Sequence, residues 1–359
     1  MKVYYATILL TALFSIMAEL FSCRHTGMAG SLKNEPRLTK LLLFLAASIL
    51  IFVAGLRYNV GADYGAYSKL GFQIFDDLEE SLQTFDEPGL RILVRILSWF
   101  TDDGAYITFT CSVITIGLFL FTAYKNEPSY AMVTMLFILV GIWSGSFNGV
   151  RQYFAAAILF AGHRLIYERK IWKYLLCVFI ATCFHLSAVV MVVLYFLLRN
   201  KLTARNIILL VLGTAIISAN YDTIFSLIGL LKVSDTASQT VYANTTVNIL
   251  RVLVACAPAG LCLILYWGKE TTEEQTFYIN ALIIHASAMV AASDSAYLAR
   301  ITIYTSPFVV VALPKLIRFD NKRLETLTRI GIIFLYAVFW YIGISESNVL
   351  REFHWIWER

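Results

Sequence analysis

The sequence lacks the short motifs that mark the common nucleotide- and metal-dependent enzymes. It contains no P-loop, no HExxH, no GxSxG and no aspartate-rich metal motif. Its six cysteines show no CxxC spacing and lie mostly in apolar stretches, which favours core packing over a metal site or disulfides. We therefore expect no bound metal and no cofactor.

Charged residues are also scarce. They make up 15% of the 359 residues, whereas 59% are hydrophobic; soluble domains carry roughly 25% charged residues. The net charge of +5 comes from short basic clusters between apolar blocks, which argues against nucleic acid as a partner. Runs such as 41–56, 130–143 and 330–344 have no polar face. The composition predicts an all-α polytopic membrane protein in a lipid bilayer.

A helix that spans a bilayer needs about 20 apolar residues. We expect a single transmembrane domain over residues 1–359, with about 10–12 transmembrane helices. The first apolar run has no cleavage pattern after it, which predicts a retained span rather than a signal peptide. The expected spans are 3–21, 38–56, 105–123, 129–145, 150–166, 206–219, 247–267, 276–293, 299–317 and 326–344.

Residues 174–198 form a further apolar run around His185, which suits either one tilted helix or two short limbs. The two-limb arrangement places most Lys and Arg residues in cytoplasmic loops, whereas a single helix would put the basic segments 199–205 and 315–329 outside. We therefore predict a broken or re-entrant hairpin. Its limbs are too short to cross alone, so they must pack against protein, with His185 at a tip inside an outward-facing cavity.

This topology places both chain termini and two larger loops outside the cytoplasm. The first extracytoplasmic loop, residues 57–104, contains an amphipathic helix near 89–100. That helix suits either the membrane surface or a plain connection between spans. The second extracytoplasmic loop, residues 220–246, is rich in Ser, Thr, Asp and Tyr.

Four arginines and one histidine fall toward the outer ends of these spans: Arg57, Arg151, Arg251, Arg300 and His185. Each arginine alone could be a headgroup anchor. Together, without matching acids within the spans, they predict a cavity for an anion, and phosphate or diphosphate suits the guanidinium group. His285 is either a packed core residue or a second cavity residue.

Three segments together resemble the EpsG family of Wzy-like polysaccharide polymerases. RYNVGADYGAY carries Arg57, Asp63 and Tyr67. NGVRQYFAAAILFAGHRLIYERKIWKYLLCVFIATCFHLSAVV carries Arg151, Gln152 and the Phe-His-x-Ser around His185. LARITIYTSPFVVVALP carries Arg300 and Tyr304. In this order the segments cover roughly residues 55–310 of the chain.

The resemblance implies a C-type glycosyltransferase (GT-C-like) on the outer face of the bacterial cytoplasmic (inner) membrane. Undecaprenyl-diphosphate-linked oligosaccharide repeat units would be both donor and acceptor, joined with inversion and without a metal or nucleotide sugar. The product would be an exopolysaccharide, capsule or O-antigen, and a chain-length regulator is a candidate partner.

Carried onto matching positions, the resemblance assigns three kinds of role. Arg57, Arg151 and Arg300 would bind diphosphate. Arg251 is a further candidate, because it lies toward the same outer face. His185 or Asp63 would take the proton from the acceptor hydroxyl. Gln152, Tyr67 and Tyr304 would hold sugar hydroxyls. Three alternatives stay open: an O-antigen ligase that uses the same donor, a lipid-linked sugar or polysaccharide transporter or flippase with an arginine-lined cavity, and an acyltransferase.

Overall fold

The computed structural model describes residues 1–22, 32–68, 77–84, 86–199, 246–296 and 298–359, together with positions 72, 212 and 216. Over these residues the fold is helical apart from one short antiparallel pair of strands, β1 (Arg57–Tyr58) and β2 (His354–Trp355). This confirms the predicted all-α class. Apart from isolated positions, the predicted span 206–219 and the loop 220–246 lie outside the described residues.

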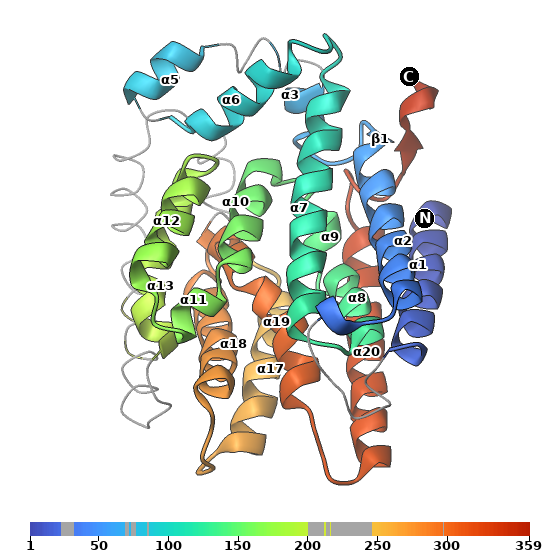
Figure 1. Ribbon diagram of the computed structural model, residues 1–359, viewed down its shortest axis with the longest axis vertical. Helices are drawn as coiled ribbons and strands as arrows, with labels where there is room; N and C mark the ends of the chain where they lie inside the picture. Colours follow the sequence, from blue (N-terminus) through green and yellow to red (C-terminus); the bar gives the residue numbers. More distant parts are fainter. Residues whose placement is uncertain are drawn as a thin grey trace.

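Five helices are long and apolar enough to cross a bilayer: α1 (Lys2–Leu20), α2 (Arg37–Gly55), α7 (Ala105–Asn126), α17 (Ile249–Tyr266) and α20 (Lys322–Ser345). At a rise of about 1.5 Å per residue, helices of this length match a hydrocarbon core of about 30 Å. α18 (Glu273–Ala291) has a similar length and packs against α17. These helices confirm a polytopic membrane protein (Figure 1).

Several predicted spans are interrupted instead of continuous. The short elements are α8 (Tyr130–Leu139), α9 (Ile142–Gly145), α10 (Val150–Ala161), α11 (Arg164–Tyr167), η4 (Leu298–Tyr304) and α19 (Ser306–Leu316). The expectation of unbroken helices over 129–145, 150–166 and 299–317 is therefore wrong. Gly141, at φ +91°, separates α8 from α9 in a conformation that L side chains rarely adopt. Broken helices at membrane depth have to be buried or line a cavity.

The predicted hairpin around His185 is present. α12 (Ile171–Thr182) ends just before it, and η3 (Leu186–Val189) and α13 (Val190–Arg199) return alongside (Figure 1). The Leu198 carbonyl accepts a hydrogen bond from Asn280 of α18 at 3.1 Å, and Arg169, just before α12, pairs with Glu273 at the start of α18 at 2.7 Å. Both limbs therefore end toward the same end of α18, with His185 at the opposite tip.

The remaining loops divide between two ends of the molecule. Ion pairs of Glu127 with Arg318 and of Lys315 with Glu274 join loops 124–128, 268–275 and 315–329 at one end. At the other end β1 pairs with β2, and the Met1 amino group lies 3.4 Å from the Arg351 carbonyl. Both termini therefore share an end with the 57–104 loop, as the predicted topology requires.

That loop contains α3 (Tyr64–Ser68), α5 (Leu78–Thr84) and α6 (Pro88–Leu97). The remaining short turns are η2 (Leu32–Asn34) and η5 (Ile356–Glu358). The apolar stripe of α6 packs against protein, since Leu90 and Val94 are buried in a cluster with Ile107 and Phe154. The sequence left two roles open for this helix: a position on the membrane surface or a plain connection between spans. Because its apolar stripe is buried against protein, the structure favours the connecting role.

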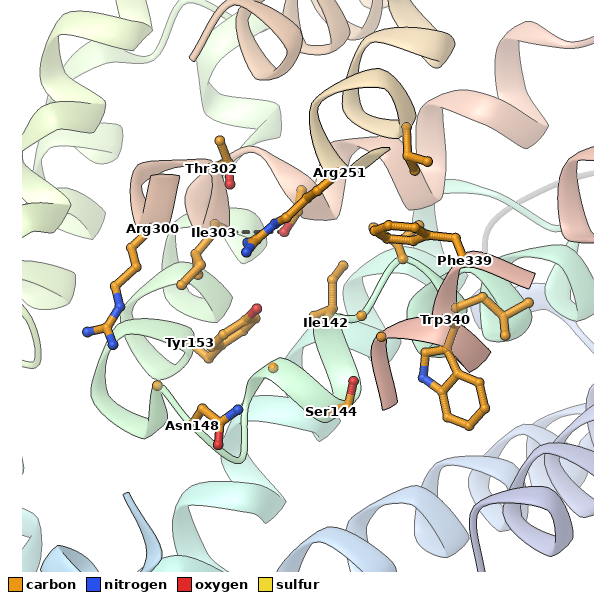
Figure 2. A pocket seen from close by; sticks show the side chains of 18 of the residues that line it. Ile142, Ser144, Asn148, Tyr153, Arg251, Arg300, Thr302, Ile303, Phe339 and Trp340 are labelled. Carbon is orange, nitrogen blue, oxygen red and sulfur yellow. Dashed lines mark hydrogen bonds between the residues drawn. The ribbon is translucent and has the colours of Figure 1, made fainter. Parts of the chain in front are cut away.

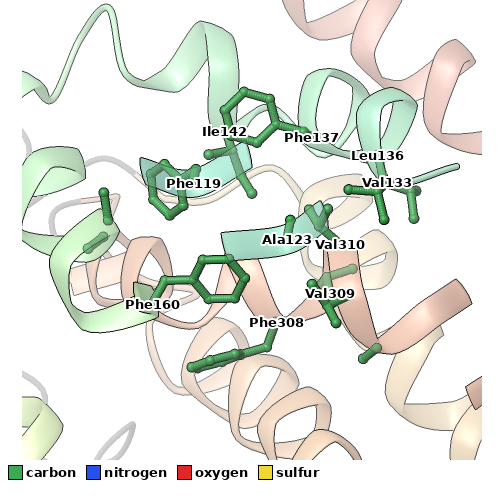
Figure 3. Close-up of a cluster of buried hydrophobic side chains, with 14 of the residues drawn as sticks. Phe119, Ala123, Val133, Leu136, Phe137, Ile142, Phe160, Phe308, Val309 and Val310 are labelled. Atoms are coloured by element: carbon green, nitrogen blue, oxygen red, sulfur yellow. The ribbon is translucent and has the colours of Figure 1, made fainter. Parts of the chain in front are cut away.

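The short helices are held by an aromatic core around α7. Phe119 of α7 lies 5.9 Å from Phe137 of α8 and 5.8 Å from Phe160 of α10, measured between ring centroids (Figure 3). Phe308 of α19 continues the cluster, 5.8 Å from Phe160. Contacts of this kind stabilise packed elements beyond their buried area. They let the broken helices hold fixed positions around the site.

Candidate functional site

A cavity of about 450 Å³ opens among α9, α10, α17, α18, η4 and α20 (Figure 2). One part of its lining is apolar and aromatic and includes Val254, Met289, Phe339 and Trp340. The other part is polar and includes Ser144, Asn148, Gln152, Tyr153, Arg251, His285, Arg300 and Thr302. None of the described residues that line the cavity is acidic. The lining therefore suits a ligand with an anionic part and an apolar part.

The two cavity arginines lie near the starts of α17 and η4. Arg251 lies in the first turn of α17, where the side chain of Asn248 caps the helix by accepting from the Leu250 amide at 2.8 Å. Arg300 lies in η4 and is exposed at the cavity. Gln152 donates from Nε2 to the Arg300 carbonyl at 3.1 Å, which joins the first turn of α10 to η4. Gln152 thus helps to place the segment that carries Arg300.

A second polar cluster adjoins the cavity. Arg151, next to Gln152 in α10, forms an ion pair with Oε2 of Glu87, the residue that precedes α6. The other oxygen, Oε1, lies 2.7 Å from Nδ1 of His185. Glu87 is only 6% exposed. Three elements distant in sequence therefore meet at one buried carboxylate.

Asp63 belongs to the same region. Its carboxyl accepts a hydrogen bond from the backbone N–H of Val150, directly before Arg151. Burial raises the pKa of Asp63 above its usual value, although the nearby charges of Arg151 and Arg300 act in the opposite direction. A carboxylate with a raised pKa takes up a proton more readily, which keeps Asp63 a candidate base.

Arg57 lies away from the cavity lining. It is 1% exposed, its Nε donates to the Val60 carbonyl at 3.0 Å, and it also donates to the Ala54 carbonyl. Its guanidinium stacks over the Phe147 ring at 4.7 Å. Its charge still reaches Asp63, and it lowers that residue's proton affinity.

The two predicted tyrosines are buried beside the second cluster. Tyr304 of η4 lies with its hydroxyl 2.7 Å from Oγ of Ser187, which connects η4 to the hairpin. Tyr67 lies near Arg151 and Glu87, and burial raises its pKa. Neither tyrosine lines the cavity in this structure.

A comparison with protein-family models identifies the family of this chain. The model of the EpsG family matches residues 40–356, which include all these site residues. The chain belongs to the EpsG family. EpsG proteins are Wzy-like polysaccharide polymerases, so this family member is a glycosyltransferase-like polymerase of polysaccharide biosynthesis. No curated protein and no solved structure matches the chain significantly.

Of the five residues that the sequence predicted to share one cavity in this EpsG protein, Arg251 and Arg300 line it, whereas Arg57, Arg151 and His185 do not. Arg251, Arg300 and Gln152 line the cavity, and so does His285, one of its two expected positions. Glu87 went unrecognised because it is one of several acids in the 57–104 loop. Asn148 and Tyr153 also line the cavity. Both residues lie within three positions of the Arg151–Gln152 pair, and this closeness was the signal in the sequence that could have identified them.

Proposed function

We propose that this EpsG protein joins lipid-diphosphate-linked oligosaccharide repeat units on the outer face of the bacterial cytoplasmic membrane. The observation that carries the proposal is the cavity, where Arg251 and Arg300 meet an apolar wall and the described lining contains no acid. A lipid-linked diphosphate combines the same two properties. Undecaprenyl diphosphate is the carrier that we propose.

In this proposal the donor diphosphate binds between Arg251 and Arg300. Guanidinium groups form charge-assisted hydrogen bonds with phosphate oxygens, and they stabilise the charge that develops on a leaving diphosphate. Arg151 lies at the border between the cavity and the second cluster, where it can contribute to the same field. Arg57 acts through its charge on Asp63 and does not contact the donor, because its guanidinium is buried against backbone carbonyls.

The acceptor sugar binds at the second cluster, beside His185 and Asp63. One of these two side chains takes the proton from the acceptor hydroxyl, and that oxygen forms a bond to the anomeric carbon of the donor. The bond from the anomeric carbon to the phosphate oxygen breaks, and its electron pair leaves with the lipid diphosphate. A single displacement of this kind inverts the anomeric centre. Gln152, Tyr67 and Tyr304 position sugar hydroxyls or the elements that hold them.

The test is complementation of a deletion strain with wild type, Arg300→Ala or His185→Ala, followed by sizing of the lipid-linked glycans. We expect wild type to restore a ladder of lengths and both variants to leave glycans at one repeat unit. Arg323→Ala is the matched control, since this exposed arginine lies at the opposite end of the molecule. It should restore the ladder.

Each result needs equal amounts of protein in the membrane, measured by immunoblot. Full-length polymer in the deletion strain or in both variants would overturn the proposal. Single repeat units that accumulate on the inner leaflet would instead favour a flippase, because a polymerase defect leaves them on the outer leaflet.

A further inference from the structure

Glu87, the residue before α6, contacts two candidate catalytic side chains, His185 and Arg151, which lie in other elements. Its Oε1 lies 2.7 Å from His185 Nδ1 at the hairpin tip, and its Oε2 pairs with Arg151 of α10. The side chains of Glu87 and His185 are 7% and 14% exposed. Breaking a buried pair leaves an uncompensated charge, so the geometry of all three groups depends on this carboxylate.

The backbone around Glu87 is held against the hairpin tip as well. Glu87 adopts a left-handed conformation at φ +52°, which is uncommon for a residue with a side chain. Two residues later, the Gly89 amide donates to the Cys183 carbonyl at 2.8 Å. A Cβ at Gly89 would lie 3.0 Å from that oxygen, so only glycine allows this approach without displacement. The start of α6 is therefore fixed on the segment that carries His185.

This contact has a chemical consequence for the imidazole. An ionised carboxylate only accepts hydrogen bonds, so His185 Nδ1 must be the donor. Nδ1 then carries a proton whether the ring is neutral or charged. Nε2 is consequently the nitrogen that gains and loses a proton, as a general base requires.

We propose that Glu87 is the positioning residue of this polymerase, which fixes His185 with Nε2 as the proton-accepting nitrogen and holds Arg151 beside Asp63. The inference rests on the proposed function and extends it, because it selects His185 over Asp63 as the base. It also makes α6, in the outer loop, part of the catalytic machinery. Acceptor binding to that loop would act on the base through Glu87 and through the backbone contact between Gly89 and Cys183.

The first experiment compares Glu87→Ala, Glu87→Gln and Asp86→Asn in purified protein in nanodiscs. The substrate is the lipid-linked single-repeat glycan extracted from the deletion strain. We expect Glu87→Ala to lower kcat by about 100-fold or more, in the range of general-base catalysis, with KM changed only a few-fold. Glu87→Gln should retain more activity, because its amide oxygen still accepts from Nδ1.

Asp86→Asn is the matched control, since this neighbouring carboxylate pairs with Arg91 at 2.8 Å and its side chain is 43% exposed. Its kcat should equal that of wild type. Equal kcat values for Glu87→Ala and wild type would overturn the inference while leaving the proposed function intact. Failure of the wild type to extend the glycan would overturn the proposed function.

A second experiment separates positioning from a purely structural role. Adding Glu87→Ala to His185→Ala should cause little further loss, since the carboxylate acts through the imidazole. Solid-state ¹⁵N NMR of histidine-labelled protein, with His185→Ala to assign the signal, should show Nδ1 protonated in wild type and in Glu87→Gln, and a changed tautomer signal in Glu87→Ala. Additive losses of kcat would overturn the inference. So would an imidazole signal that is the same in Glu87→Ala and wild type, and this readout does not depend on activity.

Discussion

Gly61 shows how one residue positions a candidate base. It has φ +94°, and its amide donates to the Val349 carbonyl at 2.9 Å. A Cβ there would overlap the carbonyl of Phe147. The next amide, of Ala62, donates to Asn148 Oδ1 at 2.7 Å, and Asp63 then accepts from the Val150 amide. Gly61 therefore brings the Asp63 loop onto the segment that precedes Arg151.

We predict that Gly61→Ala will destabilise the protein and displace Asp63. The side chain must adopt a left-handed conformation and push back a carbonyl, and such strain costs about 1–3 kcal/mol. Thermal unfolding in detergent should show a lower midpoint than wild type, and polymer synthesis should fall. Gly65→Ala is the control, because a Cβ at Gly65 meets open space. Equal midpoints for the two variants would contradict this account of the loop.

Single residues also mark the limit of what the sequence predicts about the site. Charge in an apolar context identified Arg251, Arg300 and His185, because ionisable residues within or at the ends of membrane spans are rare and costly, and their place along the span can be seen in the sequence. Depth along a helix does not show which way a side chain points. Arg57 therefore looked equivalent to the cavity arginines, although backbone carbonyls surround it. The partnership of Glu87 with His185, 98 positions apart, depends on tertiary structure alone.

At the scale of elements, hydropathy predicted which segments are apolar enough to span a membrane better than it predicted which of them form continuous helices. The long helices α1, α2 and α7 follow their predicted spans closely. The runs that contain α8, α10 and α19 are equally apolar, yet tertiary packing around α7 allows them to be short. The hairpin was predictable because the distribution of positive charge constrains every later loop.

α6 offers a test at this scale, because it carries a leucine on its buried side and an isoleucine on its exposed side. Leu90 is 1% exposed within the protein, whereas Ile92 is 43% exposed. We predict that Leu90→Ala will destabilise the protein by about 2–5 kcal/mol, as expected for a buried leucine, and that Ile92→Ala will have little effect. Thermal unfolding in detergent measures both.

Leu90→Ala should also lower polymerase activity, since a loosened α6 carries Glu87 away from the hairpin tip. If Ile92→Ala destabilises the protein as much as Leu90→Ala does, α6 is packed through its other side and its link to His185 needs revision.

For the whole molecule, the distribution of polar groups separates two ends with different properties. Ion pairs among loops 124–128, 268–275 and 315–329 hold one end together. The other end holds the strand pair, α3, α5 and α6, and the cluster formed by Glu87, Arg151 and His185 (Figure 1). A polymerase that uses exported repeat units must present this second end to the outside.

Cysteine accessibility tests this orientation directly. Glu79 of α5 and Lys269, between α17 and α18, are both exposed and lie at opposite ends. A membrane-impermeant maleimide should label Glu79→Cys in intact spheroplasts, because the proposed orientation places this position outside, and should label Lys269→Cys only after permeabilisation. The unsubstituted protein measures the background from the six native cysteines. The reverse pattern would place the arginine cavity toward the cytoplasm, where an exported donor could not reach it, and would exclude polymerisation on the outer face.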